Sequence, residues 1–371
     1  MKAKAVCISA AFIVCLALAV IIRQNASGNF SIHNVDCYEQ GKDWGGFEFE
    51  NLSLNHNKNK IQPDTLDYPG YLESPPVKTN FDFNEILLSW NCDITFSSGL
   101  YFIISVSDDS ITWHDFAYQK WGKDVSSACK YSNASENIEG IGKLDTDIIR
   151  LNAPMKYYRF SLTCIGSNND LLLLDRISVC YSNTKANLRQ FTHSRHPSDD
   201  IKAIALSVPF VSQHSLPDSI SGKACSQASI AMVLNYHSRG YSPLEVSELA
   251  YDSYNDIYGN WLYNIQAAYL LGLKNSWIGR HNSFNEIAAE IYSGKPVAIS
   301  ISFENGQLHN APYTRTDGHI IVVRGFDGKG SVLVNDPYGR TVSDGISAYD
   351  IDELTAVWIG HGGVAYHLWP E

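Results

Sequence analysis

Between residues 30 and 184, this chain of 371 residues is a succession of short runs rich in β-branched and aromatic residues. Examples lie at 86–90, 101–106 and 157–162, and polar clusters rich in turn-forming residues separate them. Short strands alternating with turns in this way are typical of an antiparallel β-sandwich or jelly roll. We therefore predict an N-terminal all-β sandwich, jelly-roll-like, over residues 30–184.

The composition changes after this region. Residues 185–203 carry charges, histidines and a proline but few apolar side chains, which is typical of a linker. A second domain is expected over residues 204–371, because a chain of this length favours about two cores. The net charge of −11, from 28 basic and 39 acidic residues, provides no basic surface for phosphate backbones. We expect no nucleic-acid partner.

The first 28 residues resemble a targeting segment. Lys2 and Lys4 precede an apolar run over residues 5–22, which Arg23 closes. This charged-then-apolar order is that of an export signal. We expect the protein to work outside the cytoplasm, either secreted after cleavage near residues 17–19 or held at the outer face of the membrane by an uncleaved N-terminal anchor.

Six of the eight cysteines follow the export segment. They are Cys37, Cys92, Cys129, Cys164, Cys180 and Cys225. Five lie in the first domain, where export permits disulfides, but an odd number leaves at least one thiol free and the spacing fixes no connectivity. Zinc ligands usually come as short-spaced pairs, and the chain has no Cys-x-x-Cys pair. We expect neither a metal nor an organic cofactor.

Cys225 lies just before an apolar run rather than within it. Apolar residues recur with helical spacing from Ile230 to Leu234, and Gly240 supplies a stop. The run predicts a central, largely buried helix that begins at Cys225 or Ser226. Backbone N–H groups and the helix dipole at that end favour a thiolate over a thiol. Cys225 is therefore a candidate nucleophile.

A base and an orienting group are found in segment 317–337. Two β-branched runs flank Asp327-Gly328, a strong signal for a two-residue hairpin turn. Counting outward from this turn places His319 opposite Asp336 on one face of the hairpin. A turn centred on 328–330 would shift the register and bring Asn335 near His319 instead. A lone histidine or aspartate is more often structural, but here three roles converge on one domain.

These features together resemble the secreted bacterial branch of cysteine peptidase family thirty-nine, the bacteriocin-processing-like group with a papain-like fold. The matching segments are 208–213, 224–225, 231–234, 318–319 and 334–337, with 259–261 and Asn264 also fitting the pattern. The resemblance spans about residues 206–369. The chain departs from the family at 226–227, where Ser-Gln stands in place of Gly-Pro or Ser-Pro.

The resemblance implies a papain-like α+β domain with cysteine peptidase activity on a peptide or protein substrate. It implies that Cys225 is the nucleophile, His319 the general base and acid, and Asp336 the orienting group. Gln213 matches the side chain that stabilises the oxyanion, and Trp261 is a candidate for substrate binding. A thiol acyltransferase or amidase would use the same residues, and a catalytically silent surface-binding module is a third alternative.

The tryptophans of the first domain allow two interpretations. Trp90, Trp113 and Trp121 lie in strand-like runs, where aromatic residues mostly fill the core. If one face of the sandwich exposed them, they would stack on sugar rings. This second interpretation alone implies a cell-surface glycan as a partner of the N-terminal domain, besides the peptide substrate, and the first interpretation is the stronger.

Overall fold

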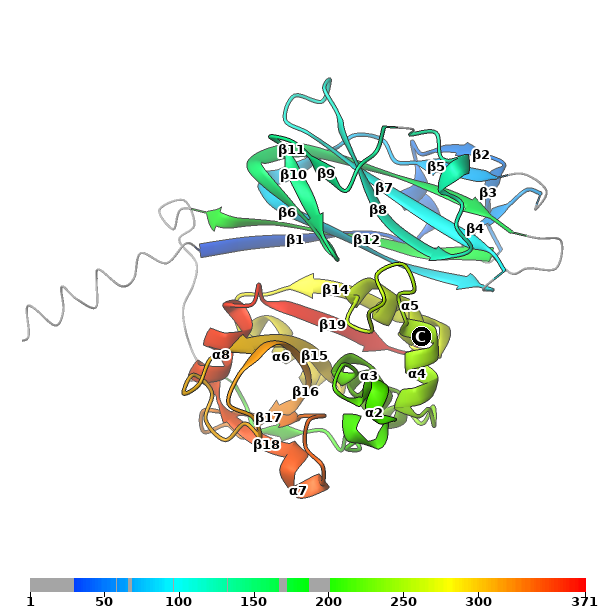
Figure 1. The fold of residues 1–371 in the computed structure, drawn as a ribbon. Coiled ribbons are helices and arrows are strands. Elements are labelled where there is room, and N and C mark those ends of the chain that lie inside the picture. The colour runs from blue at the N-terminus through cyan, green and yellow to red at the C-terminus, as the bar shows by residue number, and fades with distance from the viewer. Residues whose placement is uncertain are drawn as a thin grey trace, which may run out of the picture.

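The computed structural model describes residues 30–57, 59–65, 69–95, 97–131, 133–166, 172–186 and 201–371. The predicted export segment 1–28 lies outside the described residues, as does most of the predicted linker. Two domains follow each other along the chain and pack together (Figure 1). Among the helices in the described ranges, none has the length and apolar character needed to cross a membrane.

The N-terminal domain is one antiparallel sheet, with twelve strands in the part that the structure describes. They are β1 (Phe30–Tyr38), β2 (Glu48–Glu50), β3 (Leu52–Asn55), β4 (Lys60–Pro63), β5 (Gly70–Glu73), β6 (Val77–Ile94), β7 (Gly99–Ser107), β8 (His114–Gly122), β9 (Asn137–Ile138), β10 (Gly142–Asp145), β11 (Ile148–Ile165) and β12 (Leu172–Ala186). Short 3-10 helices lie at Gly41–Trp44 and Ser126–Ala128. Strand β12 extends into the range predicted as linker.

This sheet folds over on itself because its longest strands change partners along their length. β11 pairs with β6 through residues 149–158 and with β7 through residues 157–165, with register shifts where the partner changes. The two layers enclose Trp90, Phe102 and Phe160, which are fully buried. Trp90 stacks on Phe102 with ring centroids 4.7 Å apart. The predicted all-β sandwich is confirmed as a nearly closed antiparallel sheet.

The second domain combines a seven-stranded antiparallel sheet with helices on both faces, as described over residues 201–371. Its strands are β13 (Ile204–Ala205), β14 (Asn275–Arg280), β15 (Val297–Phe303), β16 (Thr316–Phe326), β17 (Ser331–Asn335), β18 (Ile346–Asp350) and β19 (Val364–Trp369). Its helices are η5 (Gln213–Ser215), α2 (Asp218–Ser221), α3 (Cys225–Tyr236), α4 (Pro243–Ala250), α5 (Trp261–Leu270), α6 (Phe284–Tyr292), α7 (Val342–Gly345) and α8 (Ile351–Ile359). The predicted α+β, papain-like class is confirmed.

Alternation along β16 divides the second domain into two cores. Ile320 and Val322 belong to the core beneath α3 and α5, whereas Ile321 and Val323 belong to the core beneath α6 and α8. Successive strand residues point to opposite faces, so one strand supplies both cores. The helix that begins at Cys225 therefore lies against the same strand that carries His319.

Helix α5 joins the two domains. Figure 1 shows α5 and β14 on the side of the second domain that faces the sandwich. The side-chain amide of Gln266 accepts from the Cys92 backbone N–H at 3.0 Å and donates to the Cys92 carbonyl oxygen at 2.6 Å. Tyr263 packs on Trp121 with ring centroids 4.8 Å apart. The hydrophobic residues of α5 and of the sandwich belong to one contiguous cluster, so the two domains share a core along this helix.

A buried ion pair also crosses this seam. The Arg280 guanidinium of β14 donates to the Glu85 carboxylate of β6 at 2.5 Å, and the Arg280 side chain is only 2% exposed. Arg150 of β11 binds the other oxygen of Glu85. A buried charge is tolerated only when it is paired and hydrogen-bonded, so this pair fixes how β14 sits against the sandwich.

Candidate active site

Cys225 is the first residue of α3, at its positively polarised end. The cysteine is half-buried, whereas the next nine residues of the helix are buried. Its thiol is free, as are the other five cysteines in the described residues, so no disulfide blocks the sulfur. The backbone N–H groups of Ser226, at the start of the helix, and of Ile320, on β16, hydrogen-bond the Cys225 side chain.

The hairpin of β16 and β17 has a different register from the one counted from Asp327-Gly328. Phe326 pairs with Val332 rather than Lys329, because the Asp327 N–H donates to the Ser331 carbonyl oxygen and the turn is longer. A further shift occurs between Val323 and Gly325. The two-residue turn was a wrong prediction, and the alternative turn around 328–330 matches the observed pairing near the loop.

His319 and Asp336 nevertheless meet. Strand β17 ends at Asn335, and Asp336 follows it, so the aspartate reaches the histidine from beyond the paired strand. His319 Nε2 lies 2.8 Å from Asp336 Oδ1, and both side chains are buried. Asn335 turns the other way and donates to the Val208 carbonyl oxygen at 3.0 Å. The carboxylate, not the neighbouring amide, is the partner of the imidazole.

His319 also hydrogen-bonds the Cys225 side chain, in addition to its contact with Asp336. The three side chains thus form one chain of contacts from sulfur through imidazole to carboxylate, which is the arrangement that a base-activated nucleophile requires.

Charge coupling decides the protonation of this group. Burial alone would raise the pKa of the Cys225 thiol, but the hydrogen bond and positive charge of His319 outweigh it and the pKa is lowered. Burial alone would lower the pKa of His319, but the charge and hydrogen bond of Asp336 and the bond to Cys225 raise it. Both directions favour a thiolate–imidazolium pair over a neutral thiol and imidazole.

Two tyrosines hold the carboxylate in place. The hydroxyl groups of Tyr313 and Tyr349 both donate to Asp336 Oδ2 at 3.0 Å. The backbone N–H of Tyr338 donates to Oδ1 at 3.0 Å. Burial would raise the pKa of Asp336, but the His319 charge and these donors lower it. Sequence reasoning missed both tyrosines, and no local pattern marks them, since Tyr313 comes from a loop and Tyr349 from the next strand.

Gln213 lies in a 3-10 turn, η5. Its backbone N–H donates to the carbonyl oxygen of Pro337, next to Asp336, at 2.8 Å. Its side-chain Nε2 donates to the Ser221 carbonyl oxygen at 2.9 Å. The glutamine is buried and is tied both to the segment of the carboxylate and to the segment just before Cys225.

Trp261 starts α5 and lies between the sandwich and the start of β16. Its backbone N–H donates to Asp147 of the sandwich at 3.3 Å. Its ring meets the ring of His361 edge-on at 6.4 Å, and His361 Nε2 lies beside Gly318, where an added Cβ would be 3.6 Å away. Trp261 is therefore one side chain removed from the residue that precedes His319, and its role in substrate binding stays a prediction.

The departure at 226–227 has a structural explanation. The buried amide of Gln227 donates to the Tyr258 carbonyl oxygen at 2.6 Å and to Asn264 Oδ1 at 2.7 Å. Asn264 in turn donates to the carbonyl oxygens of Tyr258 and Asn260. Helix α3 is thereby fastened to the start of α5 by side-chain amides.

Comparison with known proteins identifies the second domain. Residues 205–366 match the family model described as Peptidase_C39 like family. These residues form a Peptidase C39-like domain. A C39-like peptidase domain suggests a cysteine peptidase that acts on a peptide. No curated protein matches the chain.

Solved structures are similar to a part of the chain. A protein described as a C39-like peptidase, from Bacillus anthracis, is 18% identical, covers 46% of this chain and 98% of its own, and has a TM-score of 0.35. The peptidase domain of Streptococcus ComA, a bifunctional ABC transporter, is 17% identical over 44% and 99%, with a TM-score of 0.30. A double glycine motif protease from an AMS/PCAT transporter, in complex with the leader peptide, is 19% identical over 45% and 94%, with a TM-score of 0.29.

Proposed function

We propose that this protein is an extracytoplasmic cysteine peptidase that hydrolyses peptide bonds through Cys225, His319 and Asp336, with Gln213 in the oxyanion hole. The proposal is supported mainly by the continuous set of contacts from the free Cys225 thiol through His319 to Asp336. His319 Nε2 lies 2.8 Å from Asp336 Oδ1. The same three groups account for the raised pKa of the imidazole and the lowered pKa of the thiol.

The proposed chemistry is acyl transfer in two steps. The Cys225 thiolate attacks the carbonyl carbon, a C–S bond forms, and the developing oxyanion is stabilised by the Gln213 amide and the Cys225 backbone N–H. Imidazolium His319 gives its proton to the leaving amine as the C–N bond breaks. His319 then takes a proton from water, which attacks the thioester, and the C–S bond breaks to release the acid. Asp336 orients the ring throughout.

The place of action is part of the proposal. The order of Lys2, Lys4 and the apolar run 5–22 supports export, with the mature chain either secreted or anchored at the outer face of the membrane. Cleavage of a peptide library, with the products sequenced, would give the preferred residues on each side of the cut.

Thiol alkylation at mildly acidic pH tests the nucleophile. Iodoacetamide reacts with thiolates, so Cys225 should be labelled much faster than free cysteine, which serves as the control. His319→Ala should slow the labelling of Cys225. A labelling rate of Cys225 equal to that of free cysteine, measured by mass spectrometry, would contradict the proposal and favour the silent binding module.

Product analysis separates hydrolysis from transfer to an amine. With a cleaved peptide in hand, an added amine nucleophile competes with water for the thioester. A free carboxylic acid as the dominant product supports the peptidase, whereas an amide product at low amine concentration identifies a thiol acyltransferase on the same residues. Cys225→Ala should abolish both products.

A further inference from the structure

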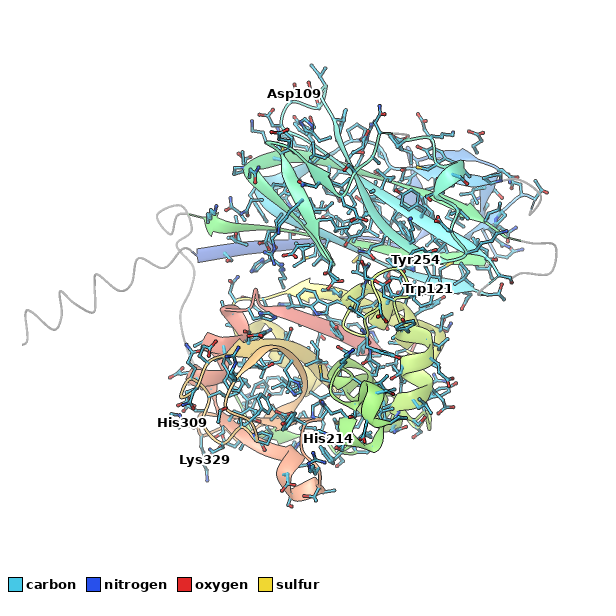
Figure 2. The ribbon with its side chains drawn as sticks, viewed as in Figure 1. Asp109, Trp121, His214, Tyr254, His309 and Lys329 are labelled. Carbon is cyan, nitrogen blue, oxygen red and sulfur yellow. The ribbon has the colours of Figure 1, made fainter. Side chains whose placement is uncertain are left out.

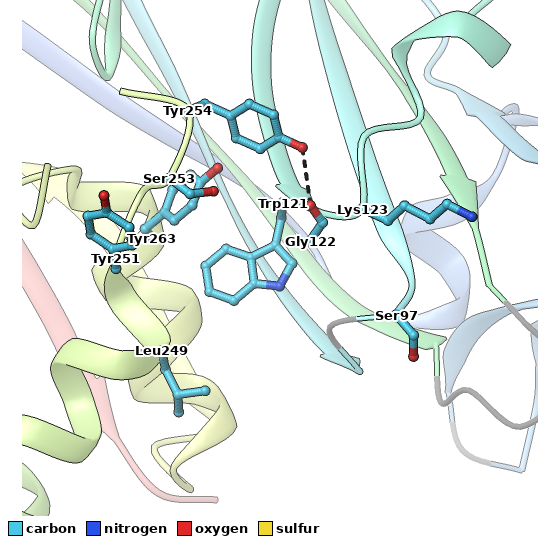
Figure 3. A pocket seen from close by; sticks show the side chains of 9 residues that line it. All are labelled: Ser97, Trp121, Gly122, Lys123, Leu249, Tyr251, Ser253, Tyr254 and Tyr263. Carbon is cyan, nitrogen blue, oxygen red and sulfur yellow. Dashed lines mark hydrogen bonds between the residues drawn. The ribbon is translucent and has the colours of Figure 1, made fainter. Parts of the chain in front are cut away.

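A cavity of about 620 Å³ opens at the seam between the two domains, lined by Trp121 and several tyrosines (Figure 3). Its polar groups are already paired within the protein. The Tyr254 hydroxyl donates across the seam to the Gly122 carbonyl oxygen at 3.1 Å. Trp121 is 2% exposed and Trp90 is fully buried, so neither tryptophan of the sandwich forms the exposed face that glycan binding would need.

Two histidines at the same seam face each other with their ring nitrogens. His281 follows directly on β14, and His367 lies in β19, the strand that pairs with β14. Their Nε2 atoms are 3.0 Å apart, although 86 residues separate them along the chain. Figure 1 shows β14 and β19 on the side of the second domain that faces the sandwich, away from the β16–β17 hairpin. The pair is therefore separate from the candidate active site.

A carboxylate holds the outer nitrogen of each imidazole. Helix α6 carries Glu286 and Glu290 one turn apart, on the same side of the helix. Glu290 Oε2 lies 2.8 Å from His367 Nδ1, and Glu286 Oε2 lies 3.3 Å from His281 Nδ1. A carboxylate only accepts hydrogen bonds, so both Nδ1 atoms donate and each neutral ring turns an unprotonated Nε2 towards the other. Carboxylates hold metal-ligating histidines in the same way.

Two unprotonated nitrogens 3.0 Å apart repel each other unless an acceptor of electron pairs joins them. A proton can do so, and it converts one ring into an imidazolium. A metal ion can do so while both rings stay neutral. Two nitrogens bound to one ion at 2.0–2.1 Å lie about 2.9–3.4 Å apart, in square-planar or tetrahedral geometry. The observed spacing falls in this range, so the two rings need little movement to share an ion.

Gly279 leaves the space beside these nitrogens open. A Cβ built on this glycine would lie 2.9 Å from His367 Nε2 and 3.2 Å from His281 Nε2. Any other residue would thus place a carbon atom against both nitrogens. The Trp277 ring stacks on the His367 imidazole with ring centroids 3.7 Å apart and an interplanar angle of 10°. The stacking and the carboxylates fix the orientation of the rings before any ion arrives.

Solvent reaches the pair from one side, and the local charge suits a cation. The His367 side chain is fully buried, but the His281 side chain is 15% exposed and that of Glu286 is 44% exposed. The cation next in sequence, Arg280, is paired with Glu85 of the sandwich. The two carboxylates of α6 therefore remain to balance the charge of a divalent ion.

Imidazole nitrogens bind zinc and the late transition metals, whereas calcium and magnesium prefer oxygen ligands. We propose that His281 and His367 together bind a divalent zinc, nickel or copper ion. Within the described ranges no three His, Cys, Asp or Glu side chains are placed to hold a metal, so water completes the coordination of this ion. The ion would fasten the end of β14, which carries the buried ion pair with the sandwich, to β19. This inference does not depend on the proposed peptidase activity.

The test uses the untagged full chain with Cys225→Ala as the parent, because a thiolate beside His319 would compete for the same metals. Isothermal titration with Zn²⁺ should show one tight site, and Zn²⁺ should raise the midpoint of thermal unfolding. His281→Ala should weaken the affinity by about tenfold or more, and Glu290→Gln, which keeps both ligands, by about tenfold. Electron paramagnetic resonance of the parent with Cu²⁺ should show two coordinated imidazole nitrogens, a result that needs no variant to fold.

His309 provides the matched control. Its Nδ1 lies 2.5 Å from Glu353 Oε1, but no second imidazole contacts it in the part of the chain that the structure describes. Figure 2 shows His309 well away from the seam, which Trp121 and Tyr254 mark. His309→Ala should bind Zn²⁺ like the parent.

Four results would overturn the inference. They are a parent that binds neither Zn²⁺ nor Cu²⁺, parent-like affinity in His281→Ala, an equal loss in His309→Ala, and a Cu²⁺ spectrum without two imidazole nitrogens. Since Cys225 is absent throughout the experiment, none of these results bears on the peptidase proposal.

Discussion

Removing the two hydroxyl groups that hold Asp336 should slow catalysis without unfolding the protein. Tyr313→Phe and Tyr349→Phe each delete one donor, 3.0 Å from Oδ2, and keep the ring in place. In either single variant Oδ2 retains the other donor. In the double variant Oδ2, a buried and charged oxygen, has lost both hydroxyl donors.

The magnitudes follow from the hydrogen bonds. A bond to a charged group contributes about 1.5–3 kcal/mol, and part of this is recovered in a single variant by the donor that remains. We expect a loss of about 1 kcal/mol, roughly fivefold in kcat/KM, for each single change. The double change should cost about 3 kcal/mol, roughly a hundredfold, which is more than the sum of the two because the last donor to a buried anion is the most costly to remove.

The pH dependence separates positioning from general damage. The pKa of Asp336 is lowered in the folded enzyme, so the carboxylate stays ionised until the pH falls below its usual range. Losing both donors raises this pKa, and a protonated Asp336 no longer holds the imidazolium of His319. The deficit of the double variant should therefore widen as the pH falls, and the acid limb of its kcat/KM profile should move to higher pH.

Peptide cleavage measured across pH, with thermal unfolding of each variant, is the assay. Tyr158→Phe is the matched control, because the buried Tyr158 hydroxyl donates to the Asp36 carboxylate at 2.7 Å within the sandwich, far from the triad. It removes the same kind of bond and should leave kcat/KM unchanged. A double variant with the kcat/KM and the acid limb of the parent would refute the reasoning.

Three further outcomes are expected. The kcat/KM of the parent should have a bell-shaped pH profile. It should fall on the acid side as the Cys225 thiolate is protonated, and on the alkaline side only above the ordinary imidazole range, because the pKa of His319 is raised. A single alkaline limb near pH 6.5 would contradict the ion pair. Glu85→Gln leaves the buried Arg280 guanidinium without its carboxylate and should lower the free energy of unfolding by about 3 kcal/mol in a denaturant titration, and a loss well below 1 kcal/mol would show the pair to be dispensable. Burial, and to a lesser extent the charge of Arg280, lower the pKa of His33 to about 3. As the pH drops from about 6.5 towards 3, the unfolded chain therefore binds a proton at His33 before the folded chain does, and the stability of the fold should fall. In thermal unfolding, His33→Gln should reduce this loss of stability with falling pH, and an unchanged pH dependence would contradict the role of His33.

Local sequence patterns predicted the elements better than their register. The helix from Cys225 was predictable because its apolar spacing and its start are properties of one short segment. The full register of the hairpin was not, because the shift between Val323 and Gly325 depends on a distant segment. Strand β13 runs so close to Gly325 that a Cβ there would lie 2.0 Å from the Ile204 carbonyl oxygen. No pattern within the hairpin reports that contact.

The sequence argument brought His319 and Asp336 together for a different reason from the one that the structure shows. Direct opposition in the hairpin was the argument, but β17 ends before Asp336 and the carboxylate is held by Tyr313, Tyr349 and the Tyr338 backbone. These partners come from a loop, a neighbouring strand and a turn. Their convergence is a tertiary property, which is why spacing along the chain could not reveal the tyrosines.

The cysteines of the sandwich illustrate the same limit. Export is compatible with disulfide formation, yet the six described cysteines are all unpaired. Cys92, Cys164 and Cys180 fill buried positions of the sheet. A buried thiol behaves as a small hydrophobic side chain, so composition alone does not separate a core cysteine from half of a crosslink.

The shared helix α5 has a consequence for how such a chain can change over evolutionary time. Gln266 satisfies both backbone groups of Cys92 in the sandwich, while the opposite surface of the same helix supports the strand layer beneath α3. A substitution that suits one partner of α5 must also be accepted by the other. Recombination that replaced the front domain with an unrelated one would leave this helix half-exposed, so the two halves are expected to have been inherited together.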